Sequence, residues 1–225
     1  MPQINRRSLL GSGAGLVGAT TLGACSVPEH AVPAAAAAVP PITGSDNQSG
    51  GADLNKAQPH LFHLGAAPAT QYDGGAIAQA NEETFPILTG QQASISFTRL
   101  RPGGIREPHW HPSAWEVNYV ISGSAQWTVL EPQGYHELFT ANTGDLVFLP
   151  QGSFHYFENQ HGTADLTVLT VFNSSAQETK DDIGIVAALN SLPRDVLGAV
   201  FGVPPSVFGT IPQSVNPVII TARKP

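Results

Sequence analysis

Two histidine-bearing segments, each beginning with a glycine, constrain this chain more than any other feature of its sequence. In the first, His109 and His111 lie two residues apart, and Glu116 follows. In the second, His155 lies in a strand-like run, 154–157. Side chains two residues apart on a β-strand point to the same face, so the first two imidazoles should lie together. Glycines mark the turns expected between the strands, at Gly103, Gly123, Gly144 and Gly152.

These four side chains form a donor set typical of a metal site. Three neutral imidazoles and one carboxylate suit Mn, Fe, Co, Ni or Zn, and suit Ca or a thiolate-preferring metal poorly. The only cysteine, Cys25, is remote from them in the sequence. Four protein ligands on a six-coordinate ion leave positions open for a substrate. We therefore predict a metal site formed by His109, His111, Glu116 and His155.

The spacing of the two segments resembles the two sequence motifs of the cupin family. Gly103 to Gly123 reads Gly-x5-His-x-His-x4-Glu-x6-Gly, and Gly144 to Asn159 reads Gly-x5-Pro-x-Gly-x2-His-x3-Asn. Every defining position of both motifs is present. The resemblance implies a mainly β cupin jelly-roll barrel, an antiparallel β-sandwich, in which these histidines and the glutamate bind the metal.

A longer run, 100–112, resembles the metal-binding strand of oxalate decarboxylases, and the segments 121–125, 144–146 and 192–203 are also similar to that family. Those enzymes usually contain two fused cupin units, whereas this chain carries one copy of each motif and resembles a single unit. The resemblance implies Mn(II), with Fe or another divalent metal as the alternative, and dioxygen as co-catalyst. It also implies oxalate as the substrate, converted to formate and carbon dioxide.

The same resemblance gives Arg106 the role of binding a substrate carboxylate. A guanidinium matches a carboxylate in shape and stays charged. Strict strand alternation would turn Arg106 away from His109, but Pro108 lies between them and can break the alternation. Without the resemblance, a surface arginine is the competing interpretation.

The proton donor of the decarboxylases is a glutamate on a lid, which corresponds to residues 173–182 of this chain. The family's lid sequence is absent here, and the position of its glutamate falls on Thr179. Glu178 is adjacent and is the candidate catalytic acid. Asp181 and Asp182 are expected instead to cap a helix that begins near Asp182. This departure leaves open an oxalate oxidase, a dioxygenase for a larger acid, or a non-catalytic cupin that binds a metal or a carboxylate.

Short runs of alternating hydrophobic and polar residues between 92 and 173 predict the strands of the sandwich. Frequent Gly (23) and Pro (19), with only 12% charged residues, also favour a turn-rich β domain. The expected strands are 94–100, 115–122, 125–131, 135–140, 145–149, 154–160 and 166–172. The expected core or pocket wall comprises Val120, Trp127, Val129, Val147, Leu149, Phe157, Leu169 and Val171. Helices are expected within 182–210, one over 182–191 and another from Pro193, as scaffold.

Residues 1–25 predict an export signal that ends in a lipid-attachment site. An arginine pair precedes an uncharged stretch, 9–24, that is too short and glycine-rich for a comfortable membrane span. The run 5–10 resembles a twin-arginine signal, and 22–25 resembles a bacterial lipobox in which Cys25 is lipidated. The expected location is the periplasm or cell surface, with membrane contact only through Cys25. An ordinary signal peptide with an incidental cysteine is the alternative.

Residues 26–58, rich in Ala, Pro, Ser and Gly, predict a linker before a single cupin domain at 59–225. The net charge of −7 and the lack of a basic stripe give no sign of a nucleic-acid partner. A homo-oligomer is expected, because a single cupin unit presents sheet edges and apolar faces that favour pairing.

Overall fold

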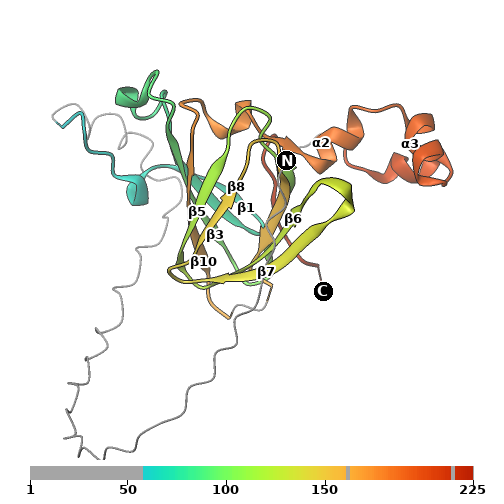
Figure 1. Cartoon of the computed structure of the whole chain (residues 1–225), viewed down its shortest axis with the longest axis horizontal. Coiled ribbons are helices and arrows are strands. Elements are labelled where there is room, and N and C mark those ends of the chain that lie inside the picture. The colour runs from blue at the N-terminus through green and yellow to red at the C-terminus, as the bar shows by residue number, and fades with distance from the viewer. Residues whose placement is uncertain (1–57, 161–162, 214–215, 225) are drawn as a thin grey trace, which may run out of the picture. The chain divides into compact units, whose positions relative to one another are not determined.

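The computed structural model describes residues 58–160, 163–213 and 216–224 of the 225-residue chain. Two antiparallel sheets face each other and form a jelly-roll barrel (Figure 1), which confirms the predicted fold class. The predicted signal, 1–25, lies outside the described residues, as does the predicted linker except Gln58. None of the helices within the described residues is long and apolar enough to cross a membrane.

Sheet A has six strands in the order β1–β2–β3–β10–β5–β8. Their bounds are Ala69–Tyr72 (β1), Gly75–Ala80 (β2), Ser94–Leu100 (β3), Leu166–Phe172 (β10), Glu116–Ser122 (β5) and Leu146–Leu149 (β8). Sheet B has the order β11–β4–β9–β6–β7, with β12 also paired to β4. Their bounds are Ile183–Gly184 (β11), Gly104–Trp110 (β4), Phe154–Glu158 (β9), Ser124–Leu130 (β6), His136–Asn142 (β7) and Ile220–Ala222 (β12).

The four motif glycines occupy the turns, as predicted. Each has a positive φ, from +77° to +95°, a conformation that glycine adopts without strain: Gly103, Gly123, Gly144 and Gly152. Strands β1 and β2 were not predicted. The burial pattern of β2 is almost continuous, and its residues are mostly small, so it lacks the alternation of large apolar side chains that identifies a half-buried strand.

The barrel interior contains six of the eight predicted core residues, among them the fully buried Trp127 and Val120. Leu169 and Val171 were placed wrongly in the core. On β10 the inward side chains are Val168, Thr170 and Phe172, so these two residues lie half-buried on the outer face of sheet A. Apolar residues occupy both faces of this strand, and hydrophobicity therefore did not identify the inward phase.

The helices are short. They are α2 (Ile185–Asn190), α3 (Arg194–Phe201) and the 3₁₀ helices η1 (Leu64–Ala66), η2 (Pro86–Leu88), η3 (Pro132–Gly134), η4 (Glu178–Lys180) and η5 (Pro205–Thr210). Three of them, η1, η2 and η3, lie before or between the strands, and the others follow β10. Helices α2 and α3 extend from one side of the barrel (Figure 1). The helix predicted from 182 begins instead at Ile185, with Gly184 as N-cap and no side-chain capping bond, so the predicted capping by Asp181 and Asp182 is wrong.

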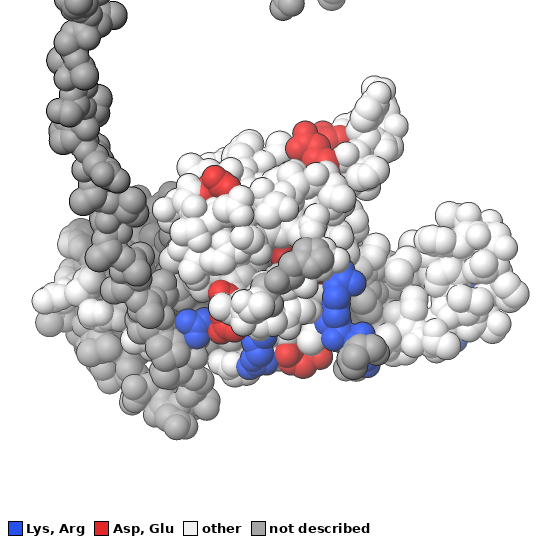
Figure 2. All heavy atoms as spheres, turned by 90° about the horizontal axis from the view of Figure 1, so that it is seen from below, with Lys and Arg blue, Asp and Glu red and all other residues white. Residues whose placement is uncertain are grey.

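Charged side chains are sparse on the face of the molecule drawn in Figure 2. The few lysines and arginines there lie beside acidic residues, and no continuous basic stripe is formed on this face. Nucleic-acid binding surfaces depend on such a stripe.

Candidate metal centre

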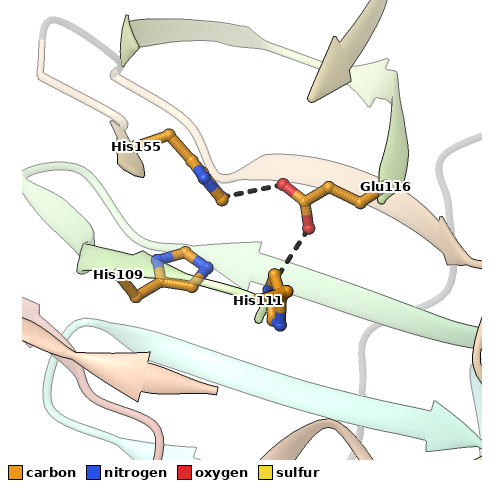
Figure 3. A group of neighbouring side chains, drawn as sticks. All are labelled: His109, His111, Glu116 and His155. Atoms are coloured by element: carbon orange, nitrogen blue, oxygen red, sulfur yellow. Dashed lines mark ion pairs between the residues drawn. The ribbon is translucent and has the colours of Figure 1, made fainter. Parts of the chain in front are cut away.

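The four predicted ligands meet inside the barrel (Figure 3). His109 lies on β4 and pairs directly with His155 on β9, and His111 follows the end of β4. Glu116 is the first residue of β5. Strand β5 belongs to sheet A, so the carboxylate comes from the sheet opposite the histidines. All four side chains are buried, and their ligand atoms lie within 4.8 Å of one another.

Each histidine is oriented by a backbone carbonyl. The Nδ1 atoms of His109, His111 and His155 lie 2.7, 3.0 and 2.9 Å from the carbonyl oxygens of Glu107, Asp181 and Ser153. A carbonyl oxygen only accepts, so each Nδ1 carries the proton and donates it. The Nε2 lone pairs are then left to face the centre, as they do in histidines that bind a metal.

The inward-facing acceptor atoms fit a divalent cation. Nε2 of His155 lies 2.8 Å from Oε1 of Glu116, and Nε2 of His111 lies 3.5 Å from Oε2. Neither Nε2 atom has a hydrogen-bond partner among the described residues. A neutral Nε2 and a carboxylate oxygen are both electron donors and repel each other unless a cation lies between them. The donor set is one that Mn, Fe, Co, Ni and Zn accept.

The electrostatics of the site favour the protonation states that a metal requires. Burial raises the pKa of Glu116, whereas positive charge on His155 and His111 lowers it, to about 2 when these imidazoles are protonated, and a cation held among these groups acts in the same direction. The Asn118 amide also donates to Glu116 Oε1 at 3.1 Å, and Thr170 orients that amide. Burial, together with Arg106, holds the pKa of His109 well below its usual value. The carboxylate is therefore ionised and His109 is neutral near neutral pH.

Arg106 lies in the interior beside this centre. The pairing of β4 with β9 shifts register between Arg106 and His109, and the two residues between them form a bulge. Because of this bulge, the side chains of Arg106 and His109 both face inward. The guanidinium is 2% exposed, and its Nη2 donates to Glu178 at 3.0 Å and to Asp182. Burial lowers the pKa of Arg106, but these two carboxylates outweigh it and raise the pKa. Arg106 thus lies in the interior beside the predicted metal ligands rather than on the surface.

Two acids from the lid segment reach the same region. Carboxylate oxygens of Glu178 and Asp182 lie within 4.8 Å of the ligand nitrogens of His109 and His111. They therefore lie beside the two histidines that they share with the predicted metal site. Asp182 was missed as a site residue. The available signal was Arg106 itself, because a buried guanidinium requires carboxylate partners.

Asp181 fastens the lid to the metal-binding loop. Its side chain accepts hydrogen bonds from the Ser113 N–H at 3.1 Å and the Ser113 hydroxyl at 2.7 Å. Its backbone carbonyl accepts the bond from His111. The chain therefore turns so that Asp181 faces the loop and Asp182 faces Arg106.

Glu107, two residues before His109, has a buried carboxyl group whose protonation affects the stability of the fold. Among the described residues, only backbone N–H groups, those of Val186 and Ile219, are close enough to favour its ionised form by hydrogen bonding. Burial raises its pKa from 4.5 to about 7, although Arg106 opposes the rise. The folded state therefore holds this proton more tightly than the unfolded state, and stability falls as pH rises from 4.5 to about 7.

Glu107→Gln is accordingly expected to stabilise the metal-free protein by up to about 3 kcal/mol at about pH 8, and by much less at about pH 5. Urea unfolding of both proteins at the two pH values measures the difference. An equal difference at the two values would contradict the raised pKa, because an uncharged glutamine cannot reproduce the titration.

Comparison with known proteins agrees with this fold and site. Residues 62–207 match the family model described as Cupin, so the chain belongs to the cupin family. The chain is 30% identical over 174 residues to a probable oxalate decarboxylase of Arthroderma benhamiae, covering 76% of this chain and 42% of that protein. It is 33% identical over 154 residues to germin-like protein subfamily 2 member 2 of Arabidopsis thaliana, covering 67% of this chain and 70% of that protein.

Among solved structures, oxalate decarboxylase from Bacillus subtilis at pH 4.6 superposes with a TM-score of 0.64 at 25% identity, covering 72% of this chain and 40% of that one. Another structure of the Bacillus subtilis enzyme, with a TM-score of 0.63 at 25% identity and covering 72% and 41% of the two chains, concerns its Mn(II) centres. The present chain spans about two fifths of the length of these decarboxylases.

Proposed function

We propose that this protein is a manganese-dependent oxalate decarboxylase-like enzyme that converts oxalate to formate and carbon dioxide. One observation carries the proposal. A buried arginine and a lid carboxylate lie beside a three-histidine, one-glutamate donor set. The similarity to oxalate decarboxylases at about 30% identity and the Mn(II) centres of the Bacillus subtilis enzyme support it.

The four ligands would hold the metal, which when bound supplies Lewis-acid and one-electron chemistry together with dioxygen. Arg106 would bind one carboxylate of oxalate as a fixed positive fork. Its two present partners, Glu178 and Asp182, must then release it, at least in part. Both belong to the lid segment, so substrate entry and lid opening would be the same event.

Glu178 would supply the proton that completes the reaction. Oxalate loses carbon dioxide when its carbon–carbon bond breaks, and the remaining carbon takes one proton to become formate. A positioned acid next to that carbon makes this transfer efficient. In the closed lid Glu178 is buried at the metal side of Arg106, the position such a donor requires.

Oxalate oxidase is the second candidate, and one observation favours it. Three side chains donate hydrogen bonds to the Glu178 carboxyl group, and none of these contacts positions a proton of Glu178 toward the substrate side. Without a proton at the carbon, oxalate and dioxygen would yield two carbon dioxides and hydrogen peroxide. A non-catalytic cupin that binds a metal or a carboxylate is the alternative from a different class.

Product analysis tests the proposal. The protein is supplied with Mn(II) under air and given isotopically labelled oxalate, and formate, carbon dioxide and peroxide are measured together. Equal yields of formate and carbon dioxide are expected. Peroxide with two carbon dioxides would establish the oxidase instead, and bound manganese without turnover would establish the binding protein.

We also propose export to the periplasm or cell surface with a lipid on Cys25, from the signal sequence alone. Labelled fatty acid should enter the wild-type protein during expression in a bacterium, and Cys25→Ser should prevent it. Labelling of both proteins, or of neither, would leave the lipid anchor without support.

A homodimer is proposed on the outer face of sheet A. Tyr119, Leu146 and Phe148 are exposed on its last two strands, and β8 is an edge strand. Adjacent exposed apolar side chains on an edge strand favour pairing. Phe148→Glu should convert the dimer to a monomer in light scattering, whereas Leu138→Glu, at an exposed position of sheet B, should not. A monomeric wild-type protein would contradict the proposal.

A further inference from the structure

Two side chains from the barrel hold the lid carboxyl of Glu178. The Gln79 amide on β2 donates to Glu178 Oε2 at 2.7 Å, and the Ser96 hydroxyl on β3 donates to the same oxygen at 2.8 Å. Gln79 and Ser96 are direct partners in the register of these strands, so they lie side by side. Arg106 occupies the other oxygen, Oε1. The carboxyl is thus held on one side by a charge and on the other by a neutral pair.

The neutral pair has a property that Arg106 lacks. A hydroxyl donates or accepts after a rotation, and an amide does so after a flip, whereas a guanidinium only donates. Gln79 and Ser96 can therefore hold Glu178 as a carboxylate and also as a carboxylic acid. Arg106 can only donate, to Oε1. When Glu178 carries its proton on Oε2, Oε1 can still accept from Arg106, but the charge–charge attraction between them is lost, so Arg106 is held less tightly and is more available to a substrate, while the neutral pair keeps the lid in place.

Gln79 also lines a cavity, whereas Ser96 is buried. The cavity has a volume of about 130 Å³, and Gln177, the residue before Glu178, lines it as well. Its other lining side chains include the polar residues Tyr72, Asn81 and Thr84. Water in this cavity would reach Gln79, which donates directly to Glu178 Oε2, so a path for proton exchange could run through Gln79 rather than through the metal side.

We propose that Gln79 and Ser96 are positioning residues that dock Glu178 in the closed lid and thereby favour formate over peroxide. The second half of this inference rests on the proposed function, because the role of Glu178 as proton donor is itself proposed. The claim that Gln79 and Ser96 hold the lid does not depend on the proposed function, because it concerns the fold alone. Lid docking and product choice are therefore measured in separate experiments.

Ser96→Ala and Gln79→Leu each remove one hydrogen bond with little change in volume. Ser94→Ala is the matched control, since Ser94 is buried on the same face of β3 and makes no hydrogen bond with Glu178. Hydrogen exchange of the lid amides, 174–182, should become about tenfold faster in the first two variants and stay unchanged in the control. Ser96→Thr, which keeps the hydroxyl, should restore the wild-type rate.

The ratio of peroxide to formate should rise by a similar factor, about tenfold, in Ser96→Ala and Gln79→Leu at unchanged metal content. A merely structural role would lower both products together and leave their ratio unchanged. If the wild-type protein makes no formate, the proposed function fails, and only the hydrogen-exchange result tests whether Gln79 and Ser96 hold the lid. If the lid amides exchange as slowly in both variants as in the wild type, Gln79 and Ser96 do not hold the lid, whatever the products are.

Discussion

Glu178→Gln is expected to lower the rate of formate formation by about a hundredfold to ten-thousandfold, the range attributed to a positioned general acid. The glutamine keeps the size of the side chain and can still accept from Arg106, so the lid should remain closed. It carries no transferable proton, however. Manganese content should be unchanged, because the four ligands are untouched, and peroxide should become the main product. Parallel assays of formate, peroxide and metal give the result.

Asp182→Asn is the matched control for Glu178→Gln. Asp182 accepts a hydrogen bond from the same Arg106 nitrogen, Nη2. Burial raises the pKa of Asp182 to about 6, although the charge of Arg106 opposes the rise. It should change the affinity for oxalate rather than the product. If Asp182→Asn abolishes formate and Glu178→Gln does not, the proton donor has been assigned to the wrong acid.

His109→Ala is expected to remove most of the bound metal, with a loss of affinity greater than about a hundredfold, since even residues that only orient a ligand contribute ten- to a hundredfold. His109 is buried and contacts the ring of His155 at a centroid distance of 4.2 Å. The domain should nevertheless stay folded, because the apolar cluster around Trp127 and Leu100 lies in the same barrel and is unchanged.

Metal analysis after dialysis, together with circular dichroism, measures this effect. His136→Ala provides the control, since His136 is exposed on β7 and belongs to no group of metal-binding side chains among the described residues. Equal metal content in His109→Ala and the wild type would show that the metal binds elsewhere. Loss of metal together with loss of fold would mean that the barrel itself depends on the ion.

The spacing in the sequence predicts which four residues form the ligand group. It does not predict which of the two sheets carries each of them. His109 and His111 share a face because they are two apart near the end of one strand, which a local pattern reveals. Glu116 follows closely in the sequence yet belongs to the opposite sheet. A crossing from one sheet to the other has no local signature, because it depends on the order in which the strands pair.

The misplaced residues share a physical cause. Leu169 and Val171 were expected inside because they are apolar, but the outer face of sheet A is apolar as well. Asp182 was expected to cap a helix because it precedes one, and its actual partner, Arg106, is 76 residues away. Rules based on neighbouring residues assign each side chain a role close to it in the sequence. For Asp182, pairing with the buried charge of Arg106 outweighs the stabilisation of about 1 kcal/mol that capping the helix would give.

The imidazole of His111 has one nitrogen turned to the metal position and the other bonded to the lid backbone at Asp181. With Nε2 on a bound ion, the proton would be confined to Nδ1, and the bond to the lid carbonyl would be strengthened. Without an ion, the ring could change tautomer and release the carbonyl. Metal binding and lid order would then be linked, each strengthening the other by the same factor. Replacing a bound metal by a more weakly held ion would thus loosen the lid as well as change the chemistry.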